Sequence, residues 1–357
     1  MDPSSLVPVA DAIPVPWGWH YVLLLVTFVL HLLFMNTMLG AGIIAFVDEL
    51  RGGAQGGEGT VAEALSHKLT YIIAFTVNLG VAPLLFLQVL YGQFIYVSSV
   101  LIAVYWIAVV FLVILAYYLA YLYNFRYQRL AGARKWVIGS AVFLLLAVGF
   151  VFTTNMTLML RPEAWERYFA SPGGMLLNLS DPTLIPRYLH FMVASVAVGG
   201  LFVALWAAKT AQPSTEQREQ RINRGMQWFT YATLAQMVIG IWFLITLKRE
   251  VMLQFMGGDS LATALLVLGI GGAVLLLLLG FQRRPLPAAV ALVATISIMA
   301  VMRDFVRAGY LEPYFTLSDL RLDPEYSPLV LFLLVFVAGM AMVVYLLRLA
   351  AKTGKEV

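Results

Sequence analysis

The residues best suited to chemistry in this sequence of 357 residues are its four histidines. His31 and His190 fall within long apolar stretches, where a neutral imidazole can ligate haem iron while its second nitrogen bonds to a carbonyl or an amide. The alternative is a structural role, in which each ring forms a hydrogen bond to a neighbouring helix. We favour the ligand role for His31 and His190. For His20 a place at the membrane interface is at least as well supported, and His67 is expected to be structural.

Thioethers and amides are the other candidate ligands. Any of the methionines within an apolar stretch could provide the second axial ligand of a haem, although packing is their usual role. Amides within such stretches could bond haem propionates or quinone carbonyls, and helix–helix hydrogen bonds are the alternative. The sequence has no cysteine, which excludes disulfides, thiolate metal sites, iron–sulfur clusters and covalently attached haem within this chain. The candidate amides are Asn36, Asn78, Gln88, Gln93, Asn155 and Gln236.

These candidates lie in a chain with the composition of an integral membrane protein. Apolar residues make up 61% of the sequence and charged residues 12%, whereas soluble domains contain about 25% charged residues. No charged residue occurs between Asp11 and Asp48 or between Lys68 and Arg126, and apolar runs longer than about 18 residues indicate membrane helices. The composition therefore excludes a soluble enzyme, a disordered scaffold and a nucleic-acid-binding protein.

The charge-free stretches predict an all-α fold: a single polytopic membrane bundle of nine transmembrane helices. The stretch between Lys68 and Arg126 is long enough for two helices, which we expect to be separated near residues 96–99. None of the helices so defined carries a charge deep inside, and this disfavours a proton-coupled transporter or pump, which needs a buried carboxylate or base. The predicted spans cover about residues 20–47, 69–95, 99–124, 136–160, 185–208, 225–247, 260–282, 285–302 and 328–349.

The distribution of Lys and Arg predicts the orientation of the chain. If the N-terminus lies outside, the inner segments contain 15 of the 23 basic residues but only 7 of the 19 acidic residues. Cytoplasmic segments are enriched in Lys and Arg, so we expect the N-terminus outside and the C-terminus inside. The first span lacks a preceding basic segment and is too long for a signal peptide, so it should be retained. The long outer loops 161–187 and 303–325 are expected either to cap the membrane interface or to dock a partner.

The residues around the two central histidines resemble subunit I of the cytochrome bd quinol oxidases. Residues 29–40 (VLHLLFMNTMLG) are similar to the first helix of that family (Y-H-F-L-F-V-P-L-T-L-G), whose histidine is an axial ligand in the high-spin haem region. Residues 181–190 (DPTLIPRYLH) are similar to the family's N-P-x-x-W-x-R-F-V-H, whose histidine ligates the low-spin haem b. The resemblance therefore implies haem ligation by His31 and His190.

Further matches extend this resemblance over about residues 20–210, and the rest of the chain matches only loosely. Residues 78–82 (NLGVA), followed by Tyr91 and Gly92, resemble the second helix of the family. Asn155 falls where the family has an asparagine at the outer end of its fourth helix. The family also has nine helices with the N-terminus outside.

The sequence departs from the family where the oxidase reduces oxygen. Residues 98–123 contain no acid, whereas the third helix of the family carries two glutamates. The long quinol-oxidising loop is replaced by a short one that begins at Lys248, and residues 265–269 (LLVLG) lack the expected methionine ligand. Ala300 stands in place of a ligating glutamate, although Arg303 corresponds to the arginine of the family. Because the acids for proton delivery and haem assembly are missing, we expect no oxygen reduction.

The resemblance implies a membrane subunit of a respiratory electron-transfer complex, acting as part of a quinol-linked oxidoreductase rather than as an enzyme alone. One or two b-type haems would link the quinone pool to a redox partner outside. The expected partner is another subunit, a periplasmic c-type cytochrome or other redox protein, in a prokaryotic cytoplasmic membrane. Since this chain has no cysteine, a c-type haem would have to be on a separate chain.

Six further residues have expected roles in this scheme. Cations near the outer face are needed for haem propionates, and an amide is expected to contribute to cofactor binding. A charged group after the sixth span lies where the family binds quinol, although such a group at a helix end is usually interfacial. Two alternatives remain: a haem-free anchor that holds quinone and a redox subunit, and a transporter without redox function. The residues are Arg187 and Arg161 for the propionates, Asn155 for the amide, and Lys248, Arg249 and Glu250 for quinone.

Overall fold

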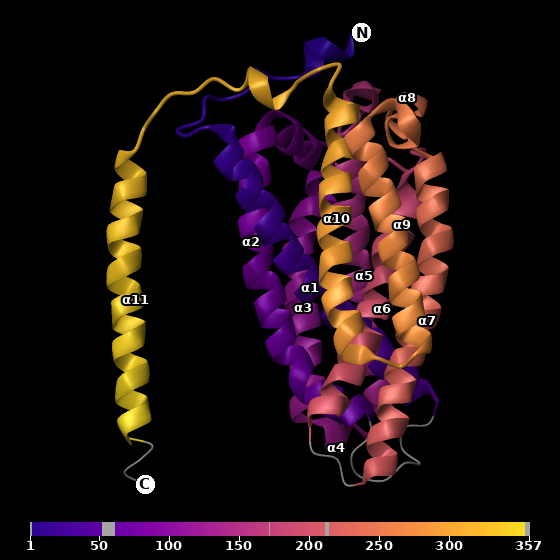
Figure 1. Ribbon diagram of the computed structural model, residues 1–357. Helices are drawn as coiled ribbons and strands as arrows, with labels where there is room; N and C mark the ends of the chain where they lie inside the picture. Colours follow the sequence, from indigo (N-terminus) through magenta and orange to yellow (C-terminus); the bar gives the residue numbers. More distant parts are fainter. Residues whose placement is uncertain (1, 52–60, 171, 211–213, 354–357) are drawn as a thin grey trace.

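The computed structural model describes residues 2–51, 61–170, 172–210 and 214–353, which form a helical bundle with one further helix beside it (Figure 1). Within these ranges, nine helices are long and apolar enough to cross a membrane. This confirms the predicted all-α polytopic bundle and makes the chain a multi-pass membrane protein. The nine are α1 (Trp17–Leu50), α2 (Val61–Leu101), α3 (Ala103–Phe125), α5 (Arg134–Met159), α6 (Leu184–Lys209), α7 (Thr215–Ile245), α9 (Ser260–Phe281), α10 (Pro285–Leu311) and α11 (Ser327–Thr353).

Short helical segments close the two ends of the bundle. The end with the N-terminus also carries the 3-10 helix η3 (Pro162–Ala170), α8 (Arg249–Leu253) and the π-helix η4 (Gln254–Gly258). We call this end the N-terminal face. The opposite end carries α4 (Tyr127–Leu130) and the last described turn of α11 (Figure 1).

Several helix boundaries differ from the sequence prediction. The helix α2 begins at Val61 rather than near residue 69, and α7 begins at Thr215 rather than near residue 225. The turn between α2 and α3 lies at Ile102 and not at residues 96–99, and non-helical backbone at Tyr91 introduces a kink within α2. In addition, α10 does not end at residue 302 but continues to Leu311. The extension is possible because Asp304 and Arg307, one helical turn apart, form an ion pair with each other, and such a pair offsets the cost of burying the two charges.

Close contacts between glycines place α6 between α1 and α7. A Cβ atom on Gly40 of α1 would lie 1.8 Å from the carbonyl oxygen of Ser195 in α6, and one on Gly199 would lie 2.4 Å from the backbone of Gly40. On the other side of α6, a Cβ atom on Gly225 of α7 would lie 2.6 Å from the carbonyl oxygen of Gly200. Such crossings, in which small residues let the backbones approach, are typical of membrane helices. They hold α1, α6 and α7 in one unit.

The last helix, α11, stands apart from the bundle (Figure 1), and all its described side chains are exposed. The linker before it is tied to the N-terminal segment. The backbone N–H of Ile13 donates to the carbonyl oxygen of Arg321 at 2.9 Å, and the N–H of Asp323 donates to that of Ile13 at 2.9 Å. The linker, rather than side-chain packing, therefore positions α11.

Candidate functional site

His31 lies on α1 with its ring against the backbone of α2. Its Nδ1 atom is 3.1 Å from the carbonyl oxygen of Thr76. A Cβ atom on Gly80 would lie 2.8 Å from the ring carbon Cε1, so only glycine fits beside the ring in this position. A carbonyl accepts a hydrogen bond only from a protonated Nδ1, which leaves the lone pair of Nε2 free to bind a metal.

His190 lies on α6 and packs in a similar way against α7. A Cβ atom on Gly240 would lie 3.3 Å from its Cε1 and 3.6 Å from its Nδ1. The ring is tilted against Phe243, with the ring centroids 6.0 Å apart. The Nδ1 atom is buried and has no hydrogen-bond partner among the described residues. Both predicted ligand histidines thus face a glycine of the neighbouring helix.

Arg187 lies one turn before His190 on α6, toward the N-terminal face. Its side chain is buried, and its guanidinium carbon lies 4.9 Å from the centre of the Phe243 ring. It forms no ion pair with any carboxylate of the described residues, and its Nε atom is buried without a hydrogen-bond partner there. A buried cation that lacks a counter-charge is costly, so this position favours an anionic ligand.

Arg303 on α10 has a comparable position relative to His31. Its guanidinium carbon lies 4.5 Å from the centre of the Phe28 ring, and Phe28 is one turn before His31 on α1. Its Nη2 atom lies 3.5 Å from the sulfur of Met156, and within the described ranges it has no ion pair with a carboxylate. Each candidate histidine therefore has near it, on the side of the N-terminal face, an arginine that lies on an aromatic ring. Neither arginine forms an ion pair with a carboxylate of the described residues.

Two other arginines of this region are compensated by acids. Arg307 pairs with the buried Asp304, and Arg161 pairs with Asp181, whose Oδ2 lies 2.6 Å from the Nε of Arg161. Arg161, unlike Arg187, therefore already has a counter-charge. Its predicted role in binding a propionate stays a prediction.

Buried charges occur toward the ends of two of the long helices. Arg187, Asp304 and Arg307 are at most 5% exposed and belong to the long helices α6 and α10. All three lie in the end turns of those helices, so the middle of each described helix remains free of charge. The sequence prediction concerned charges deep inside the helices, and these buried charges at the helix ends do not contradict it.

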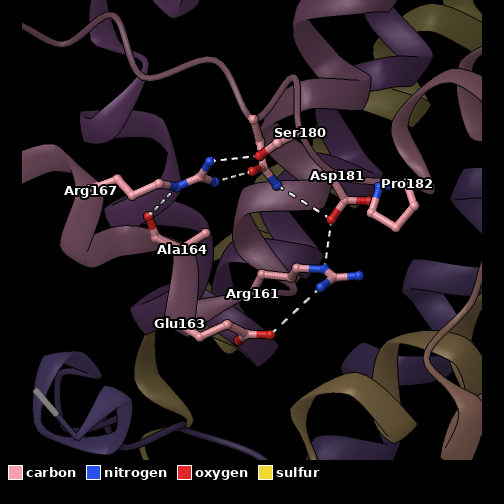
Figure 2. Close-up of a pocket in the computed structure, with 8 residues that line it drawn as sticks. Arg161, Glu163, Ala164, Arg167, Ser180, Asp181 and Pro182 are labelled. Atoms are coloured by element: carbon pink, nitrogen blue, oxygen red, sulfur yellow. Dashed lines mark hydrogen bonds and ion pairs between the residues drawn. The ribbon is translucent and has the colours of Figure 1, made fainter.

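A pocket of about 250 Å³ opens at the N-terminal face, between η3 and the segment that leads into α6 (Figure 2). Arg167 crosses it and donates to the side chains of Ser180 and Asn178, while Arg161 lies between Asp181 and Glu163. These bonds join η3 to the segment that leads into α6. The pocket is lined by Arg161, Glu163, Ala164, Arg167, Asn178, Ser180, Asp181 and Pro182.

Glu163 connects η3 to the start of α8. Its carboxylate lies 2.8 Å from the Nζ of Lys248, and the backbone N–H of Lys248 donates to the hydroxyl of Tyr310 at 2.9 Å. Burial opposes ionisation of Glu163, but the hydrogen bond and charge of Lys248 outweigh it and lower the pKa of the carboxyl group. Of the three residues predicted to bind quinone, Lys248 belongs to this network, whereas Arg249 and Glu250 are exposed.

Asn155 is fully buried and joins α5 to α2. Its Oδ1 accepts from the hydroxyl of Ser98 at 2.5 Å, and its Nδ2 donates to the hydroxyl of Ser99 at 3.0 Å. The oxygen and the nitrogen of this amide are therefore both engaged in helix–helix bonds, and a role in cofactor binding stays a prediction. His67 bonds to Asn124 of α3 at 2.8 Å, as expected for a structural histidine.

Several residues of this site were not identified from the sequence. Gly80 and Gly240 resemble any other glycine in an apolar helix, because the ring that each faces comes from a distant part of the chain. Asp304 and Arg307 were assigned to a loop, although their opposite charges one turn apart are the pattern that permits a helix.

Comparisons with known proteins add no assignment: no family model and no curated protein matches the sequence. Within the described ranges, no group of three or more His, Cys, Asp or Glu side chains could hold a metal ion. A haem iron, however, needs only one or two protein ligands. Its candidate ligands are the two histidines that face glycines.

Proposed function

We propose that this chain is the membrane subunit of a respiratory electron-transfer complex, related to subunit I of cytochrome bd. It holds b-type haem at His31 and His190 and exchanges electrons between the quinone pool and a redox partner on the outer side. The observation that carries the proposal is the pairing of each histidine with an arginine that has no acid partner among the described residues, Arg303 near His31 and Arg187 near His190.

The donor groups of this region suit a haem. A haem needs axial ligands for its iron and cations for its two propionates, and arginine forms strong bonds with carboxylates. The Nε2 atoms of His31 and His190 would hold the iron, and the guanidinium groups of Arg187 and Arg303 would bind propionates. When bound, the haem supplies one-electron transfer at its iron. The apolar helices around the site exclude water.

The orientation is part of the proposal. The excess of Lys and Arg in the segments opposite the N-terminal face favours an outer location for that face. The arginines then lie near the outer side, and η3 and α8 form the surface that a periplasmic c-type cytochrome or another redox subunit would contact. The region of Lys248, Arg249 and Glu250 is our candidate for quinone binding. The membrane would be the cytoplasmic membrane of a prokaryote.

We propose no oxygen reduction by this complex. No acidic residue occurs in α3, and Ala300 occupies the position at which the oxidase family has a ligating glutamate. Oxygen uptake by the isolated complex with a quinol analogue would overturn this part of the proposal.

A reduced-minus-oxidised visible spectrum of the complex, purified from membranes, tests the haem site. We expect the α-band of b-type haem, and we expect His31→Ala and His190→Ala each to remove or shift part of it. His67→Ala is the matched control, because His67 is bonded to Asn124 and should leave the spectrum unchanged. If the unaltered complex shows no b-type haem band in this chain, the haem proposal fails and a haem-free anchor becomes the better explanation.

A further inference from the structure

We propose that Gly80 and Gly240 are positioning residues for the two histidines. Each glycine allows an imidazole ring to lie directly on the backbone of the neighbouring helix, where its Nδ1–H donates to a helix carbonyl and its Nε2 is turned toward the ligand. That Nε2 binds a haem iron rests on the proposed function. That Nδ1 carries a proton and donates it to a carbonyl does not, so haem binding and the protonation of Nδ1 can be tested separately.

The arrangement is complete at His31. In a regular α-helix the N–H of Gly80 donates to the carbonyl oxygen of Thr76, and the same oxygen lies 3.1 Å from the Nδ1 of His31. A carbonyl oxygen has two lone pairs and can accept both bonds. A Cβ atom on Gly80 would lie 2.8 Å from Cε1 and 3.0 Å from Nδ1 of the ring. Any side chain at this position would therefore displace the ring edge that makes the bond.

His190 lies against Gly240 of α7 as His31 lies against Gly80 of α2. A Cβ atom on Gly240 would lie nearest to the same edge of the ring, 3.3 Å from Cε1 and 3.6 Å from Nδ1. At His31 the acceptor, Thr76, is four residues before Gly80. The residue four before Gly240 is Gln236. The Nδ1 of His190 is buried without a partner among the described residues, so it is available to donate to the carbonyl of this residue. We assign the backbone oxygen of Gln236 as its acceptor.

The hydrogen bond on one nitrogen of a histidine determines what the other nitrogen can do. A donated Nδ1–H leaves the lone pair on Nε2 and makes that nitrogen a stronger ligand. Stronger donation to iron favours its oxidised state. Displacement of the ring by a methyl group at Gly80 or Gly240 should therefore weaken the ligand and raise the midpoint potential of the haem that it binds.

Nitrogen NMR of the purified, reduced full chain with ¹⁵N-labelled histidine tests the proposal, since the sequence has only four histidines. We expect His31 and His190, assigned by their loss in His31→Ala and His190→Ala, to carry the proton on Nδ1. Gly80→Ala should shift only the His31 signals and Gly240→Ala only those of His190. Gly271→Ala in α9 is the control, because a Cβ there meets no atom within 4 Å. Gln236→Leu keeps the backbone carbonyl and should leave His190 unchanged.

The measurement on the unaltered chain decides the proposal even if a variant does not fold. A proton on Nε2 of His31 or His190 would overturn the assignment for that histidine, and so would unchanged signals in a folded Gly80→Ala or Gly240→Ala protein. A shift of the His190 signals in Gln236→Leu would assign the bond to the side chain instead and overturn our choice of acceptor. If the chain proves to hold no haem, the proposed function fails, whereas the tautomers still confirm or refute the role of the glycines.

Discussion

Among single residues, four arginines near the N-terminal face divide into two kinds. Arg161 and Arg307 each have a carboxylate beside them, whereas Arg187 and Arg303 are held by aromatic rings and have no acid partner within the described residues. A paired arginine stabilises the local fold. An arginine without a counter-charge keeps a positive charge available to a ligand. This difference leads to separate expectations for the two kinds.

Replacing an unpaired arginine should change the redox potential of the haem. A positive charge near the iron disfavours the oxidised state, so Arg187→Gln or Arg303→Gln should lower the midpoint potential. At a separation of ~10 Å and an effective dielectric constant of ~20, one charge contributes roughly 1–2 kcal/mol, or some tens of millivolts for one electron. A redox titration followed by the visible spectrum measures this. Arg284→Gln, on the exposed turn at the opposite face, should have no effect, and an equal shift in that control would contradict the assignment.

The carboxyl group of Glu163 should make the N-terminal face sensitive to acid. Its pKa is lowered in the folded state, so its stabilising effect is complete above the ordinary pKa of a carboxyl and is lost as the pH falls through the lowered value. Protonation breaks the ion pair with Lys248. Hydrogen exchange in η3 should therefore become faster at acidic pH than at neutral pH, relative to the bundle. In Glu163→Gln exchange should be fast at both pH values, and a pH effect of the same size in this variant would contradict the expectation.

At the level of the helices, the close approach of α1 and α6 depends on Gly40 and Gly199. Neither contact can accept a Cβ atom without a backbone shift, because the atoms that it would meet belong to the other backbone. These two helices carry His31 and His190. Their crossing therefore determines the relation between the two histidines as well as the stability of the bundle.

Gly199→Ala should destabilise the bundle by about 1–3 kcal/mol, the usual cost of overpacking a tight contact. Gly271→Ala adds the same methyl group in open space and should be neutral or slightly stabilising because alanine favours the helix. Unfolding of the two detergent-solubilised variants, followed by circular dichroism, compares them directly. Equal stability of the two variants would contradict the tight crossing.

Over the whole molecule, the described residues form a bundle of eight long helices and a ninth, α11, that stands beside it (Figure 1). The side chains of α11 bury nothing against the bundle. The backbone bonds between Ile13 and the linker hold the start of α11 at the N-terminal face. The arrangement predicts that the bundle folds without this helix.

Removal of residues 327–357 should leave the unfolding temperature of the bundle within a few degrees of that of the full chain, since little packing is lost. Weakening the core should have a larger effect. Phe229→Ala, at a fully buried position of α7, provides that comparison, because loss of a buried aromatic ring costs about 3–5 kcal/mol. A truncated chain that unfolds as readily as Phe229→Ala would show that α11 stabilises the bundle.

The sequence by itself determined the class of the fold and most of its elements. Long apolar runs without charge indicate membrane helices, and they predicted nine of them, the number that the described residues form. The turn at Ile102 and the end of α10 were missed, because the first lies within a continuous apolar stretch and the second depends on the pairing of Asp304 with Arg307.

The tertiary structure alone decided which side chains act together. His31 meets Thr76 and Gly80, and His190 faces Gly240, through helix contacts that no local pattern encodes. In the same way, only the folded chain shows that Arg187 lacks an acid partner within the described ranges, whereas Arg161 has one. Hydropathy and helix length follow from neighbouring residues, but the partner of a buried polar group is set by the helix that packs beside it, and that helix comes from elsewhere in the chain.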